Sequence, residues 1–152
     1  MKMIPKSFTV SLCLFLLGCT SGSASNPAVQ TPAEKISLDP CPNTPNCVSS
    51  LNPTDKHYIP PLRYTGKKEF AYLKLIGIIE SMPRAHIAVE QANYIRVEFR
   101  SAFFKFVDDV EFLFSSNQPE IELRSASRVG YYDFGVNRRR MEDIRNKWEK
   151  AP

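Results

Sequence analysis

The chain has 152 residues, with 20 basic and 16 acidic side chains and a formal net charge of +4 at neutral pH. Residues 1–18 contain two lysines and no acid, so without them the net charge is +2. Such a nearly balanced charge argues against a nucleic-acid-binding protein, whose binding domain is strongly basic. The length suits a single domain with one hydrophobic core, and the sequence shows no internal repeat.

The first predicted segment, residues 1–18, is an export signal. Two lysines precede an apolar stretch over residues 8–17, which is too short to span a membrane as a helix. Residues 16–19, Leu-Leu-Gly-Cys, resemble the lipobox of bacterial lipoproteins, and this resemblance implies cleavage before Cys19 and attachment of acyl chains to that residue. An ordinary signal peptide with a chance cysteine is the alternative.

The same resemblance implies a lipid-anchored protein in the bacterial cell envelope. Two or three acyl chains on Cys19 would form a stable membrane anchor, because one chain alone binds a bilayer only marginally. Thr20 stands where an acid would signal retention, which favours the outer membrane, facing the periplasm. Residues 19–39 are rich in Ser, Ala, Pro, Gln and Thr, so beyond the lipidated cysteine they predict a flexible tether.

Residues 40–152 are expected to form the single folded domain, which begins with an irregular arm. Six prolines between residues 40 and 61 interrupt any periodicity. Cys41 and Cys47 lie in this arm, and an oxidising envelope would let them form a disulfide. A metal site is the alternative, but two cysteines without a second pair or a His-rich segment fall short of a zinc site. We therefore predict a disulfide-braced arm and no metal.

Hydrophobic periodicity after the arm predicts a helix, four strands and a second helix. The first helix covers residues 67–82 and stops before Pro83. The second helix starts near Asn137, a good N-cap residue. Turn-forming residues at 91–93 and 115–119 favour hairpins between strands. The pattern predicts a two-layer α+β fold, with an antiparallel sheet of about four strands flanked by two helices. Apolar residues at every second position mark the strands: Ile87 and Val89; Ile95, Val97 and Phe99; Val110, Phe112 and Phe114; Ile121 and Leu123.

Acids, serines and arginines are concentrated in residues 107–112, 121–130 and 133–140. Together with residues 41–50 and 99–101, these runs resemble a bacterial family, the domain of unknown function 1499 family. The resemblance covers roughly residues 40–145. It names a family and implies no activity.

Strand alternation places a lattice of charged side chains on the face of the sheet opposite the core. On this face we expect Arg100 to pair with Asp109 or Glu111, and Arg124 to pair with Glu111. Solvated pairs of this kind contribute only a fraction of a kcal/mol each, so the lattice can be purely structural.

Asp108 falls on the core side of its strand, as do Ser101, Ser125 and Ser127. A buried carboxylate needs a hydrogen-bond donor or a cation. We expect Asp108 to accept from a serine hydroxyl, a backbone amide or an arginine. These groups form either a buried network or the floor of a pocket.

Three consecutive arginines, residues 138–140, follow Asn137 at the predicted helix start, where the positive end of the helix dipole favours acids. Glu142 and Asp143 lie four residues after Arg138 and Arg139 and can compensate, as can Asp109, Glu111 or Asp133. The alternative is that the amides of the helix end bind an anionic ligand together with Arg128, Arg138 and Arg140. The loop over residues 131–134, with its aromatic rings and a carboxylate, either forms the rim of a pocket or covers the end of the core.

No motif of a catalytic or cofactor site is present, and the chain has only two histidines, His57 and His86. The leading prediction is a non-catalytic envelope protein, without a cofactor, that binds an anionic envelope component or a protein partner. One alternative is a hydrolase of envelope glycan or lipid that uses Asp108, Asp109 or Glu111 as acid or base. Another is a purely structural protein. The expected binding contacts are Arg100, Arg124, Arg128, Arg138 and Arg140, oriented by Asp109, Glu111 and Asp133.

Overall fold

A computed structural model describes residues 37–151 of the chain. The predicted signal segment, the acylation of Cys19 and most of the predicted tether lie outside these residues. Within them, no helix is both long and apolar enough to cross a membrane.

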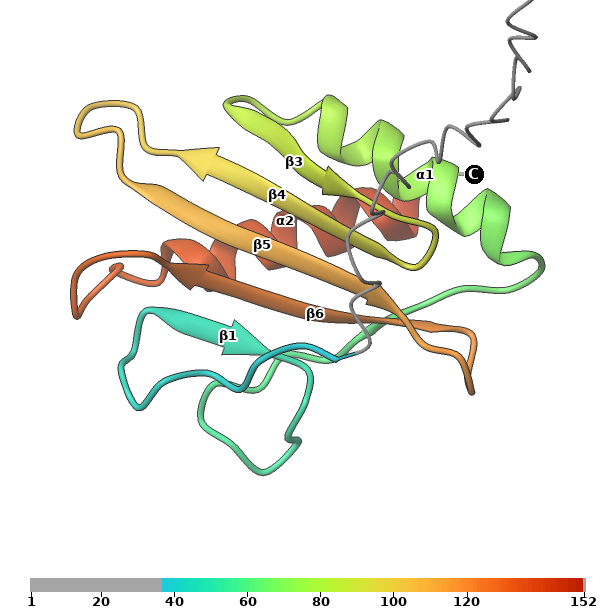
Figure 1. Cartoon of the computed structure of the whole chain (residues 1–152), viewed down its shortest axis with the longest axis horizontal. Helices are drawn as coiled ribbons and strands as arrows, with labels where there is room; N and C mark the ends of the chain where they lie inside the picture. Colours follow the sequence, from blue (N-terminus) through green and yellow to red (C-terminus); the bar gives the residue numbers. More distant parts are fainter. Residues whose placement is uncertain (1–36, 152) are drawn as a thin grey trace, which may run out of the picture. The chain divides into compact units, whose positions relative to one another are not determined.

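The described residues form one antiparallel sheet and two helices (Figure 1). Strands follow the order β1-β6-β5-β4-β3 across the sheet, and β2 also pairs with β6. This arrangement confirms the predicted α+β fold. The strands are β1 Cys47–Ser49, β2 Leu62–Arg63, β3 Ala85–Glu90, β4 Tyr94–Arg100, β5 Val107–Phe114 and β6 Glu120–Ser127; the helices are α1 Lys68–Glu80 and α2 Val136–Lys150.

The sheet has six strands, so the predicted number of about four was too low. Of the two additional strands, β1 lies in the proline-rich arm and β2 directly follows it. In β1, Cys47 pairs with Ala126, and in β2, Leu62 pairs with Ile121, so both short strands lie along the same edge of β6. Strands of three and two residues are too short to show an alternating pattern, which is why periodicity missed them.

The predicted disulfide between Cys41 and Cys47 is confirmed. It ties the irregular start of the arm to the first residue of β1. The arm is therefore fixed to the sheet edge at its cysteine and at β2.

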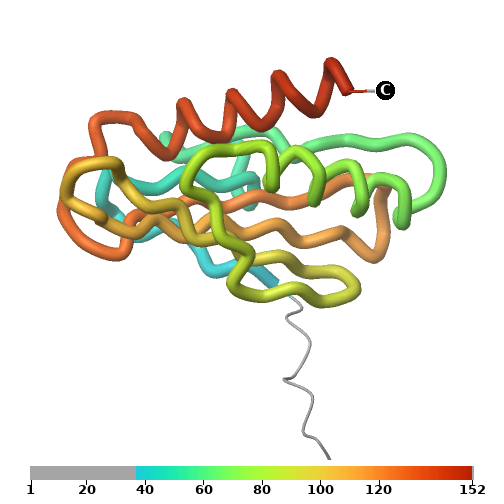
Figure 2. Tube along the Cα trace, turned by 90° about the horizontal axis from the view of Figure 1, so that it is seen from above, coloured from blue at the N-terminus to red at the C-terminus, as the bar shows by residue number. Residues whose placement is uncertain are grey.

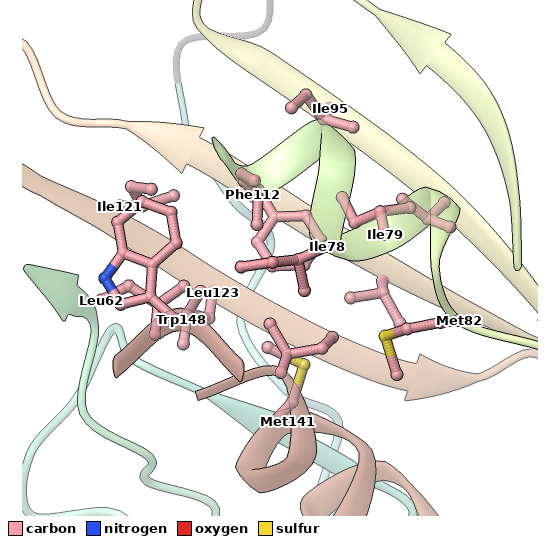
Figure 3. Close-up of a cluster of buried hydrophobic side chains, with 14 of the residues drawn as sticks. Leu62, Ile78, Ile79, Met82, Ile95, Phe112, Ile121, Leu123, Met141 and Trp148 are labelled. Atoms are coloured by element: carbon pink, nitrogen blue, oxygen red, sulfur yellow. The ribbon is translucent and has the colours of Figure 1, made fainter. Parts of the chain in front are cut away.

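Both helices cover the same face of the sheet, as the view from above shows (Figure 2). Alternate residues of β4, β5 and β6 point towards them and are buried with Leu75 and Ile79 of α1 and Met141 and Ile144 of α2. Figure 3 shows how side chains from both helices meet those of the sheet in this core. Trp148 closes one end of the core and donates its indole N–H to the carbonyl oxygen of Arg63, 2.9 Å away.

The opposite face of the sheet, which we call the open face, carries the charged lattice. Among residues 37–151, an apolar cluster on this face joins Leu38 to Tyr94 and Leu113. The ladder between β3 and β4 shifts register between Ile87 and Val89, so β3, the edge strand at one end of the sheet, is irregular.

The prediction that Asn137 caps α2 was wrong. The N-cap is Gly135, whose φ of 74° is the left-handed conformation that glycine adopts readily. Asn137 lies inside the first turn and is fully buried. The carboxylate of Asp133 supplies the capping hydrogen bonds, since it accepts from the backbone N–H groups of Gly135 at 2.9 Å and Asn137 at 2.8 Å.

Candidate functional site

A buried polar network lies between β5, β6 and the start of α2. Arg140 donates from Nη2 to Oδ2 of Asp108 at 2.6 Å and from Nη1 to Oδ1 of Asn137 at 2.8 Å. The hydroxyl of Ser125 also donates to Oδ1 of Asn137, at 2.6 Å. The expectation that an arginine binds Asp108 on the core side is thus confirmed.

Asn137 links this network to the arm. Its Nδ2 donates to the carbonyl oxygen of Asn46 at 2.9 Å and to the hydroxyl of Ser127 at 3.0 Å. Ser101, by contrast, is exposed, and its hydroxyl oxygen accepts from the backbone N–H of Phe106. Its expected place on the core side was wrong because β4 ends at Arg100, so the strand alternation does not extend to it.

The open face holds the predicted ion-pair lattice with one change of partners. Arg124 donates to Glu111 at 2.9 Å, as expected. Arg128 binds both oxygens of Asp109, at 2.7 and 2.8 Å, and also donates to Glu98.

The predicted pairing of Arg100 with Asp109 or Glu111 was wrong. Arg100 lies opposite Val107, whereas Asp109 lies opposite Glu98. The strand register therefore leaves Arg100 beside Glu98, to which it donates at 3.1 Å.

The electrostatics of the open face follow from these contacts. The hydrogen bond from Arg128 lowers the pKa of Glu98 below its usual range, with the positive charges of Arg128 and Arg100 acting in the same direction. The hydrogen bonds to Asp109 and Glu98 raise the pKa of Arg128. Burial, together with repulsion from Glu120, raises the pKa of Glu122.

The candidate site residues do not form one site, because they lie on two faces of the sheet. Arg100, Asp109, Glu111, Arg124 and Arg128 lie on the open face, and all of them take part in ion pairs. Asp133, Arg138 and Arg140 lie around the start of α2. The predicted anion site of Arg128, Arg138 and Arg140 is therefore not assembled, since Arg128 is bound to Asp109 and Arg140 to Asp108 on opposite faces.

A hollow of about 350 Å³ lies where the start of α2 meets the arm. We call it the basic hollow, because Lys56, Arg138 and Arg139 line it. Two of these three residues were not among the predicted contacts. Lys56 lies in a segment without periodicity, and Arg139 was treated only as a charge to be compensated. The hollow is lined by Pro45, Cys47, Val48, Lys56, His57, Asp133, Gly135, Arg138 and Arg139.

Arg138 and Arg139 bind backbone carbonyl oxygens instead of carboxylates. Arg138 donates from Nη1 to the carbonyl oxygen of Tyr58 at 3.0 Å, and Arg139 donates from Nη1 to that of Phe134 at 2.8 Å. Glu142, the acid expected to compensate Arg138, pairs with Arg145 at 3.6 Å. Among residues 37–151, neither Arg138 nor Arg139 has a carboxylate within ion-pair distance.

His57 lines the same hollow and is 6% exposed. Its Nδ1 lies 2.8 Å from the carbonyl oxygen of Cys47, so in the neutral ring this nitrogen carries the hydrogen and Nε2 is an acceptor. Nε2 has no hydrogen-bond partner among the described residues, and the nearest carboxylate oxygen, on Asp55, is 4.0 Å away. A buried polar atom without a partner is uncommon in a folded domain.

The acids of the hydrolase alternative do not converge. Asp108 faces α2, while Asp109 and Glu111 lie on the open face, and each of the three accepts a hydrogen bond from an arginine. Within the part of the chain that the structure describes, no group of three or more His, Cys, Asp and Glu side chains could hold a metal ion.

Comparison with known proteins gives a family without an activity. A comparison with curated proteins found no match. The model of the family described as Protein of unknown function (DUF1499) matches residues 37–148, which include both helices up to Trp148 and the whole sheet. The resemblance seen in the acid, serine and arginine runs is thereby confirmed, and the chain belongs to this family of proteins of unknown function.

Proposed function

We propose that the protein is a non-catalytic, lipid-anchored binding protein of the bacterial cell envelope that holds an anionic envelope component in the basic hollow. The observation that carries the proposal is the pair of arginines, Arg138 and Arg139, that line a concavity without any carboxylate partner among the described residues. Every other arginine named above as a contact is held by an acid. The two guanidinium groups keep N–H donors available for phosphate or carboxylate.

The helix end itself contributes charge but few free donors. The carboxylate of Asp133 already accepts from the backbone N–H groups of Gly135 and Asn137. An anion would therefore bind through the guanidinium groups of Arg138 and Arg139 and the ammonium group of Lys56. The positive end of the α2 dipole would favour it there.

His57 narrows the chemistry of the ligand. Its unpartnered Nε2 is an acceptor in the neutral ring, so it suits a ligand that carries a hydroxyl group beside its anionic group. Phosphorylated glycerol or sugar units have both groups. We therefore favour a phosphate ester of a polyol over a simple carboxylate.

The proposal is tested by isothermal titration calorimetry, in which glycerol 3-phosphate is added to the full chain. Replacing Arg138 and Arg139 by glutamine should weaken binding at least about tenfold, because a hydrogen bond to a charged group contributes about 1.5–3 kcal/mol. Arg128→Gln is the matched control, since Arg128 is held by Asp109 on the open face, and it should leave the affinity unchanged. Equal affinity in all three proteins would contradict the proposal and favour a purely structural role for the two arginines.

Membrane attachment through Cys19 is a separate part of the proposal with a separate test. A clickable palmitate analogue fed to bacteria that express the full chain should label the protein, because the lipobox-like residues 16–19 imply acylation of Cys19. The Cys19→Ala variant should carry no label. A label that persists in this variant would contradict the anchor.

A further inference from the structure

Six aromatic side chains are exposed at one end of the sheet. They lie in two loops, residues 101–106 between β4 and β5 and residues 128–135 between β6 and α2. Phe103 is 90% exposed and Phe134 is 84% exposed. We call this surface the aromatic end. It consists of Phe103, Phe104, Phe106, Tyr131, Tyr132 and Phe134.

The two loops are neighbours in space. The backbone N–H of Arg128, at the base of one loop, donates to the carbonyl oxygen of Val107, at the base of the other, at 3.1 Å. Both loops lie at the same end of the domain in Figures 1 and 2. The rings contact each other within each loop, with centroids 5.6 Å apart for Phe104 and Phe106 and 5.3 Å apart for Tyr131 and Tyr132.

These rings are not part of the hydrophobic core, because they are outside both apolar clusters of the domain. Exposed apolar groups gathered in one place mark an interaction surface, whereas single exposed apolar residues need no explanation. The aromatic end therefore has the character of an interaction surface.

We propose that the aromatic end inserts into the surface of a lipid bilayer that contains anionic lipids. Phe103 and Phe134 are almost fully exposed on loops, and neither lines the basic hollow. Rings that project from loops suit the fluid acyl region of a bilayer, whereas the contact residues of a protein interface are usually held in well-packed pockets. Phenylalanine, tyrosine and lysine together are typical of the membrane interface, where rings enter the acyl boundary and ammonium groups stay among the headgroups.

The charge around the rings fits this partner. Residues 100–106 and 128–139 contain five basic side chains and one acidic side chain. Lys105, Arg138 and Arg139 have no carboxylate partner among residues 37–151. Their positive charge would be attracted to the negative surface of a bilayer with anionic lipids. Arg138 and Arg139 also line the basic hollow. The inference itself rests on the six aromatic rings, so it does not depend on ligand binding in the hollow.

Tryptophan quenching in the full chain tests the insertion. The chain has one tryptophan, the buried Trp148, so a second tryptophan reports on its own position once the wild-type signal is subtracted. Phe104→Trp and Tyr132→Trp place the reporter in the two loops. Phe70→Trp is the matched control, because Phe70 is also exposed, at 69%, but lies on α1.

The proteins are reconstituted into vesicles of phosphatidylcholine and phosphatidylglycerol whose acyl chains carry bromine. Bromine should quench the reporters at positions 104 and 132 at least about twofold more than the one at position 70, because only an inserted ring reaches the acyl region. A membrane anchor at the N-terminus would be common to all variants, so it cannot produce this difference. Omitting phosphatidylglycerol should reduce the quenching in the loops.

Equal quenching at all three positions, or none at positions 104 and 132, would overturn the inference. A blue shift of the loop reporters without bromine quenching would also overturn it, in favour of contact with a protein or a second copy of the chain. Unchanged quenching in the Arg138→Gln, Arg139→Gln variant would show that insertion stands even where anion binding fails. The far-ultraviolet circular dichroism of each variant verifies that it is folded.

Discussion

Asp108 and Asp109 are neighbours in β5, and each accepts a hydrogen bond from an arginine, but they lie on opposite faces of the sheet. Asp108 pairs with Arg140 beneath α2, where both side chains are nearly buried. Asp109 pairs with Arg128 on the open face, where the arginine is 40% exposed. The chemistry of the two pairs is the same, so the difference between them lies in how much water each side chain has lost. The covered pair should be essential to stability, and the open pair nearly dispensable.

Arg140→Ala, which breaks the covered pair, should have the largest effect on the free energy of unfolding. It leaves the carboxylate of Asp108 without its cation at a site that water barely reaches, and we expect the free energy of unfolding to fall by about 3 kcal/mol. Urea denaturation followed by circular dichroism measures the loss. Adding Asp108→Asn to Arg140→Ala should recover part of it by removing the buried charge. A loss below about 1 kcal/mol would mean that the covered pair contributes no more to stability than a solvent-exposed pair, which would contradict the comparison.

Asn137→Ala should have the second largest effect. Its fully buried side chain joins the arm, β6 and α2, and removing it leaves the hydroxyl of Ser125 and the carbonyl oxygen of Asn46 without these partners. We expect unfolding to become easier by about 2 kcal/mol. Asn146→Ala, at an exposed position of the same helix, is the control and should change little. Similar values for both variants would argue against a network role for Asn137.

Arg128→Ala should cost less than about 1 kcal/mol at physiological salt, and less still at high salt. The pH dependence of this stability loss shows whether it arises from the ion pair with Glu98. Arg128 lowers the pKa of Glu98 in the folded protein, so the stability that this carboxylate contributes is complete above its unfolded pKa and is lost as the pH falls through the lowered folded value. The difference in stability between wild type and variant should therefore vanish in acid. A difference that does not change with pH would contradict this origin.

Glu122→Gln should have the smallest effect and the opposite sign. Burial and the nearby Glu120 raise the pKa of Glu122 in the folded protein, so ionisation of Glu122 opposes folding. Stability therefore falls as the pH rises from the unfolded pKa of this group through its raised folded pKa. The variant should gain roughly a few tenths of a kcal/mol at neutral pH. Thermal unfolding at neutral and acidic pH should show a gain only at neutral pH, and a gain at both would point to packing instead of charge.

The regular part of the fold was readable from the sequence because its patterns are long. The strands β4, β5 and β6 have seven or eight residues each, which is enough for alternation to define the buried face. The same alternation correctly placed Asp108 on the core side of its strand and Arg124 on the same face as Glu111, with which it pairs. The short strands β1 and β2, in and directly after the proline-rich arm, have no such pattern, and they were missed.

Partners across strands were harder to predict, because a face assignment does not fix the register. Arg100 and Asp109 share a face, but the register of β4 against β5 puts Val107, and not Asp109, opposite Arg100. Asp109 therefore pairs with Arg128, and Arg100 pairs with Glu98. The basic hollow could not be predicted for a similar reason. Lys56 and Arg138 are far apart in sequence, and only the pairing of the arm with β6 brings them together.

The edges of the sheet determine how the protein behaves when it is crowded. β1 and β2 occupy the outer edge of β6 in succession, so a strand from another molecule could pair there only with these two very short strands. The opposite edge strand, β3, is interrupted by the register shift between Ile87 and Val89, which makes it a poor template for pairing. If the proposed lipid anchor holds many copies close together, their sheets would thus resist joining into aggregates.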